Sequence, residues 1–155
     1  MIAQQNLYTM PFGTLRIAKP LTIIQNHKKM TKDVNEIQSK LIEILKEHIG
    51  VLKVSAETNQ KFEVSGTIET MQGKKKVDGI YFSSVVPKPK DVRFYFFPTY
   101  THKEQIGELP DNLKKSLKGK SCFHVKYMDT DFEQNLRELV QKSVELYQND
   151  GLLAK

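Results

Sequence analysis

Strand patterns follow one another between residues 51 and 97 with only short turns between them. The clearest pattern alternates apolar or small residues with polar ones, at Phe62, Val64, Gly66, Ile68 and Thr70. This period of two is typical of a strand with one buried and one solvated face. Parallel neighbours require long crossover connections, and the turns here are too short to supply them. The segment therefore predicts an antiparallel meander.

The remaining strand patterns complete the expected sheet. They cover residues 51–56, 80–86, 92–97 and 121–127. Residues 73–79 have a glycine near each end and are typical of a hairpin loop. Prolines in 87–91 indicate a turn, because proline removes a backbone donor and restricts the preceding residue. Together the patterns predict a sheet of about five strands.

A long helix is expected before the strands. Asp33 and Glu36 have the spacing of a capping box, and apolar residues then recur at helical spacing as far as Ile49. Gly50 is the expected end of this helix. His48, near the apolar stripe, is interpreted as a residue of the helix end.

A second long helix is expected at the other end of the chain, with shorter helices before it. Thr130 and Glu133 form the predicted capping box, and the apolar face ends before Asp150. Short helices are expected over residues 102–109 and 110–117. Two long helices packed on one face of an antiparallel sheet define an α+β fold.

Length and charge indicate how the chain is divided. The 155 residues fit one domain, and a net charge of +6 is concentrated at the start. Residues 1–29 hold four basic residues and no acid, so residues 30–155 carry only +2. We interpret residues 1–29 as a flexible extension, or as a misassigned start with Met30 as the natural beginning. Residues 30–155 are then the single folded domain.

Composition also limits the compartment and the partners. No run approaches the roughly 20 apolar residues of a membrane span, so no membrane partner is expected. A lone cysteine cannot form an internal disulfide, which fits the cytoplasm. The small charge of the folded part argues against a nucleic-acid partner.

The sequence contains no recognisable catalytic constellation. Cys122 and His124 share a strand face, but side chains two residues apart stand about 6–7 Å from each other, too far for a direct hydrogen bond. Gly119-Lys120-Ser121 resembles the end of a phosphate-binding loop, but the upstream glycine is missing and a strand follows. We therefore predict that the protein is not an enzyme.

Aromatic residues are expected on both faces of the strand over 92–97. Phe94 and Phe96 belong to one face, and Tyr95 and Phe97 to the other. One face should pack on helices, whereas the other is covered by a loop or partner or left open for binding. The candidate binding surface consists of Tyr95, Phe97, Lys120, Cys122, His124 and Lys126. A homo-oligomer could form through the same face.

A family resemblance covers residues 31–149. Its residues are Tyr81-Phe82-Ser83-Ser84-Val85, Val92 to Tyr100, Leu109-Pro110 with Leu113-Lys114-Lys115, Leu117 to Lys126, and Glu145-Leu146-Tyr147. In order and spacing they resemble the YdhG-like bacterial family, a group largely described as a domain of unknown function. The resemblance implies a small cytoplasmic α+β protein and supplies no catalytic motif.

Some members of that family are described as frataxin-like iron chaperones. Iron delivery requires hard, exposed carboxylates. The candidate metal ligands here are Asp129, Asp131 and Glu133, although the acids of this chain are scattered among lysines. No cofactor other than iron is suggested.

Three functions remain open from the sequence. The first is a non-enzymatic binding or adaptor domain, the second is iron binding and delivery, and the third is a nucleic-acid-binding module. An exposed aromatic face with a continuous basic rim would favour nucleic acid, and clustered exposed carboxylates would favour iron.

Overall fold

The computed structural model of the protein describes residues 29–155, so the predicted extension lies, apart from Lys29, outside the described residues. The helices are α2 (Val34–Lys46), α3 (Pro98–Thr101), α4 (Lys103–Ile106), α5 (Asp111–Ser116) and α6 (Thr130–Asn149). The strands are β1 (Leu52–Thr58), β2 (Lys61–Gly66), β3 (Thr70–Gln72), β4 (Lys75–Val77), β5 (Tyr81–Pro87), β6 (Val92–Phe96), β7 (Leu117–Lys118) and β8 (Cys122–Val125).

Within the described residues, the main sheet has six strands in the order β1-β2-β5-β6-β8-β7, and every neighbouring pair is antiparallel. Strands β3 and β4 form a separate two-stranded sheet. The expected meander is present from β1 to β6, and β8 then pairs with β6. The α+β class is confirmed, while the strand number differs from the expected five.

One predicted strand is broken in two. Alternation suggested a single strand over 62–70, but β2 ends at Gly66, and the next strand begins at Thr70. The amide of Gly66 donates to the carbonyl oxygen of Ile80 over 2.8 Å. A Cβ built on Gly79 would lie only 1.9 Å from the carbonyl oxygen of Gly66. The predicted loop over 73–79 was also too long, because β4 occupies part of it.

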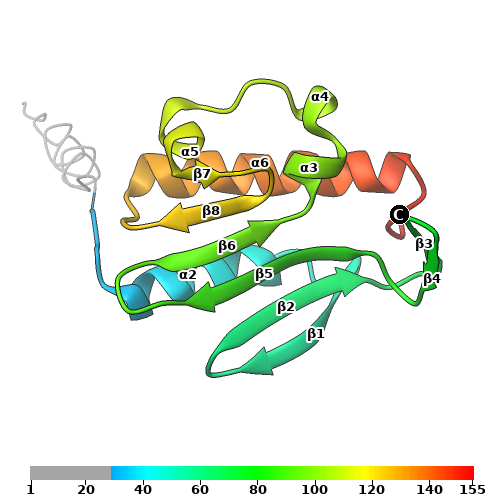
Figure 1. The fold of residues 1–155 in the computed structure, drawn as a ribbon, viewed down its shortest axis with the longest axis horizontal. Helices are drawn as coiled ribbons and strands as arrows, with labels where there is room; N and C mark the ends of the chain where they lie inside the picture. Colours follow the sequence, from blue (N-terminus) through cyan, green and yellow to red (C-terminus); the bar gives the residue numbers. More distant parts are fainter. Residues whose placement is uncertain (1–28) are drawn as a thin grey trace, which may run out of the picture.

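Both long helices lie behind the main sheet in Figure 1, and the opposite face, called here the open face, points toward the viewer.

Asp33 caps α2, since its side chain accepts a hydrogen bond from the Glu36 amide over 3.0 Å. The expected end at Gly50 was wrong, because α2 ends at Lys46. The expected cap at Thr130 was also wrong, because Asp129 accepts from the Phe132 amide over 2.8 Å.

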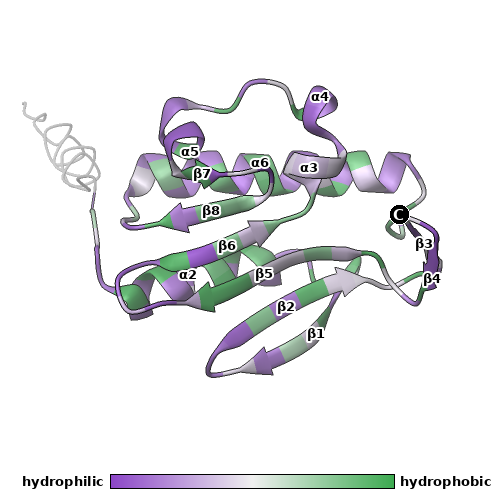
Figure 2. Ribbon diagram, in the orientation of Figure 1, coloured by the Kyte–Doolittle hydropathy of each residue, from purple (hydrophilic) through white to green (hydrophobic). Residues whose placement is uncertain are grey.

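Aromatic rings dominate the core between the sheet and the two long helices. Phe94 and Phe96 stack with ring centroids 5.4 Å apart. Phe82 meets Phe96 and Tyr147 edge to face, at 5.3 Å and 5.4 Å. All four side chains are fully buried. Figure 2 shows hydrophobic and hydrophilic residues alternating along β2, as expected for a sheet covered on one face.

No helix within the described range is long and apolar enough to cross a membrane.

Candidate functional site: a lysine cleft

A cleft of about 500 Å³ lies beside the edge of the main sheet that ends in β7. One wall comes from residues 99–109 and the other from residues 114–120. We call it the lysine cleft, because Lys103, Lys114 and Lys120 all line it. Its volume is within the range of about 300–1,000 Å³ that small-molecule sites occupy.

The first wall forms because the chain leaves β6 abruptly. Pro98 occupies the start of α3, where its missing amide costs no helical hydrogen bond. Phe97 therefore precedes a helix instead of ending the strand, and the predicted strand over 92–97 is one residue too long. The hydroxyl of buried Thr99 lies 2.8 Å from the Phe96 carbonyl oxygen and 3.0 Å from that of Lys120. This side chain joins the two walls.

A chain of hydrogen bonds fixes the first wall to α6. The ring of buried His102 is 2.7 Å from the Asp150 carboxylate and 2.9 Å from the Thr101 hydroxyl. The Thr101 hydroxyl is in turn 2.7 Å from the phenol of Tyr147. An Asp-His-Thr order resembles a catalytic triad. Here the hydroxyl is already bonded to a fully buried tyrosine, so the arrangement ties the wall in place.

An aromatic ring and a lysine are paired at the mouth of the lysine cleft. Tyr100 is 53% exposed, and the ammonium of Lys120 lies 5.4 Å from its ring centroid. This distance is suitable for a cation–π contact, which restrains the lysine side chain. Phe97 packs on Tyr100 at 5.9 Å and on Tyr81 at 5.7 Å. A row of rings thus runs from the open face of the sheet to the cleft.

The charges of the lysine cleft are unbalanced. Lys114 contacts Glu108 over 2.9 Å, and this hydrogen-bonded ion pair lowers the pKa of Glu108 and raises that of Lys114. Within residues 29–155, no ion pair joins Lys103 or Lys120 to an acid. Ile106, Leu109 and Leu117 supply apolar lining. The cleft therefore presents two uncompensated ammonium groups beside an apolar surface.

The six residues of the predicted binding surface fall in different places. Tyr95 and Cys122 are register partners on the open face, and His124 lies opposite Arg93. Lys126 is exposed beyond the end of β8. Phe97 and Lys120 instead flank Tyr100. The structure thus separates a sheet-face group from a group at the cleft.

The sheet-face group is polar and partly buried. Burial raises the pKa of the Cys122 thiol. The pKa of His124 is lowered mainly by burial and secondly by the positive charge of nearby Arg93. Tyr81 bonds to Ser84 over 2.8 Å, and Ser84 donates to Glu63 over 3.1 Å. Burial raises the pKa of Tyr81 to about 12. Tyr81, Ser84 and Glu63 therefore form a hydrogen-bonded group that joins β5 to β2.

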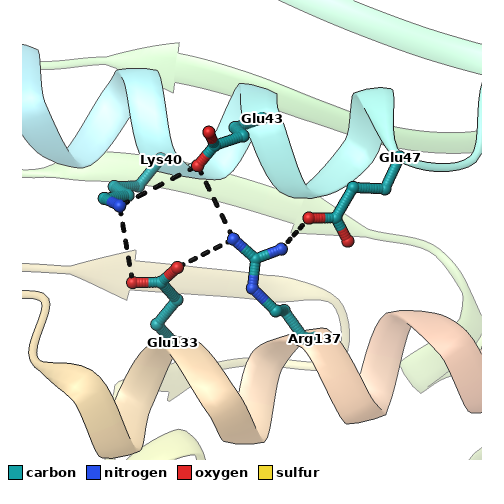
Figure 3. Close-up of polar contacts among 5 residues, drawn as sticks. All are labelled: Lys40, Glu43, Glu47, Glu133 and Arg137. Atoms are coloured by element: carbon teal, nitrogen blue, oxygen red, sulfur yellow. Dashed lines mark hydrogen bonds and ion pairs between the residues drawn. The ribbon is translucent and has the colours of Figure 1, made fainter. Parts of the chain in front are cut away.

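The three candidate iron ligands do not form a common site. Asp129 caps α6, and Glu133 contacts Lys40 at 3.8 Å and Arg137 at 2.8 Å. Figure 3 shows Glu133 inside an ion-pair network between α2 and α6, in which Arg137 also contacts Glu43 and Glu47. In the part of the chain that the structure describes, no group of three His, Cys, Asp or Glu side chains could hold a metal ion.

Sequence reasoning missed most of the lysine cleft. Tyr100, Lys103 and Lys114 were not identified as site residues, and only Lys120 was. The available signal was Pro98, whose preference for a first helical turn starts the short helix that carries Tyr100. Lysines have no periodic signature, so the convergence of three of them could not be read from spacing.

Comparison with protein-family models, with curated proteins and with solved structures gave no match for this chain.

Proposed function

We propose that this protein is a non-enzymatic binding domain and that the lysine cleft binds an organic anion. The observation that carries the proposal is the pair of uncompensated ammonium groups, Lys103 and Lys120, beside an exposed aromatic ring and an apolar lining. Lysine supplies point charges for a carboxylate, sulfonate or phosphate oxygen, and the apolar lining accepts a hydrocarbon body.

The walls of the cleft support the proposal through their rigidity. His102, Asp150 and Tyr147 anchor one wall to α6, and Thr99 links it to the other wall. A site that is ordered before binding loses less conformational entropy on binding. The hydroxyls of Thr99 and Thr101 are both engaged in these contacts.

The earlier alternatives have weaker support. Iron delivery would use Asp129 and Glu133, which already serve as a helix cap and an ion-pair partner. Binding of single-stranded nucleic acid would use a flat row of rings on which bases stack. The ring planes of Tyr81 and Phe97 are instead tilted by 57°, and those of Phe97 and Tyr100 by 37°. We keep the YdhG-like relationship and a cytoplasmic location as proposals, supported by the order of the quoted motifs and by the single cysteine.

A pair of matched probes tests the proposed function. Naphthalene sulfonate carries one anionic group, and naphthalene sulfonamide has nearly the same body without the charge. Calorimetry on the full chain should show saturable binding of the sulfonate only. Lys120→Met should weaken it roughly tenfold, as expected for a hydrogen bond to a charged group.

Lys126→Met is the matched control, because it removes the same charge from an exposed lysine that does not line the cleft. It should leave the affinity for the sulfonate unchanged. Equal binding of the sulfonamide, or equal weakening by both lysine substitutions, would refute an anion site at the lysine cleft.

A further inference from the structure

Among residues 29–155, Glu108 is the only acid that lines the lysine cleft. It follows Gly107, whose φ of +78° ends α4 in a conformation that favours glycine, and it precedes the start of α5. This turn brings its carboxylate within 2.9 Å of the Lys114 ammonium. Both side chains are well exposed, at 77% for Glu108 and 61% for Lys114.

An exposed ion pair of this kind contributes little to folding stability and is readily exchanged with ions in solution. Its main effect is therefore on the field inside the cleft. With Glu108 in place, one of the three lysine charges is cancelled, and two remain for a ligand. Without Glu108, all three would be available.

We infer that Glu108 is an internal counter-ion that tunes the ligand preference of the lysine cleft: by neutralising Lys114, it disfavours compounds with a second anionic group relative to compounds with one anionic group and an apolar body. This inference rests on the proposed function and defines its ligand class. A single oxyanion is attracted by Lys103 and Lys120. A second anionic group on the same body that approaches Lys114 must either displace Glu108 or lie beside its carboxylate, and like charges at such distances repel.

The test compares naphthalene sulfonate with naphthalene disulfonate, which adds a second anionic group to the same body. Calorimetry is run at low ionic strength, where charge effects at an exposed site are least screened. The ratio of the two affinities is measured first for the native protein. Glu108→Gln should tighten binding of the disulfonate by about threefold or more, and that of the monosulfonate by less.

Glu104→Gln is the control, because it removes the same charge from an exposed residue of α4 outside the cleft lining. It should leave the ratio of the two affinities unchanged. The inference is overturned if Glu108→Gln leaves that ratio unchanged, or if Glu104→Gln alters it equally. Failure of the monosulfonate to bind the native protein would instead overturn the proposed function and the inference with it.

Discussion

Replacing Gly79 with alanine tests why β2 ends where it does. The added Cβ would lie 1.9 Å from the Gly66 carbonyl oxygen, whereas real Cβ atoms keep at least 3.0 Å. The two segments must therefore separate by about 1 Å, which stretches the 2.8 Å hydrogen bond from Gly66 to Ile80 beyond bonding range. Overpacking costs about 2 kcal/mol and the lost hydrogen bond about 1 kcal/mol, so unfolding should become easier by about 3 kcal/mol.

Thermal unfolding followed by circular dichroism measures this effect. For a chain of this size, about 3 kcal/mol corresponds to a fall in Tm of roughly 9 °C. Gly73→Ala is the control, because Gly73 has a φ of +64° and no atom within 4 Å of its built Cβ. It should cost only the backbone strain, about 1 kcal/mol, or roughly 3 °C. Equal changes in Tm for the two variants would refute the close-approach argument.

Three further outcomes are expected. Burial raises the pKa of Tyr81 and Tyr147 to about 12. The stability contributed by their neutral phenols is therefore complete below pH 10 and is lost as the pH rises from 10 to 12. Absorbance titration should show both phenols ionising well above pH 10, and ionisation near pH 10 in the folded protein would contradict this. Alkylation of Cys122 should reach half its maximal rate above the ordinary thiol pKa of about 8.5, because burial disfavours the thiolate, and a lower midpoint would indicate an activated thiol. Anaerobic calorimetry with ferrous ions should give no saturable site with a Kd below about 10 μM, because Asp129 already caps α6 and Glu133 already pairs with Arg137. A tighter site that is abolished by neutralising Asp129, Asp131 and Glu133 would favour iron delivery.

Strand β6 illustrates how much of the fold could be predicted from the sequence. Alternation correctly assigned Phe94 and Phe96 to the buried face. It failed one residue later, at Phe97, because the preference of Pro98 for a helical first turn outweighs the apolar pattern. Local patterns therefore predicted the elements better than their ends.

The break after β2 has a different cause. The alternating pattern continues through Ile68, and Gly66 was counted as one of its small residues instead of as a break. At this end Gly79, which is distant in sequence, approaches the carbonyl oxygen of Gly66 closely. Similarly, the tie between His102 and Asp150 joins residues 48 positions apart. Contacts of this kind position the lysine cleft, and a single sequence does not reveal them.

The most direct test of the anion site is a chemical-shift map of the ligand on the folded protein. Naphthalene sulfonate is titrated into the isotopically labelled full chain, and backbone amide signals are followed by NMR. We predict the largest shifts at Tyr100, Lys103 and Lys120, with saturation in the native protein and a strongly reduced response in Lys120→Met. Shifts concentrated at Tyr95, Cys122 and His124 on the open face, or no saturable shifts at all, would contradict this prediction.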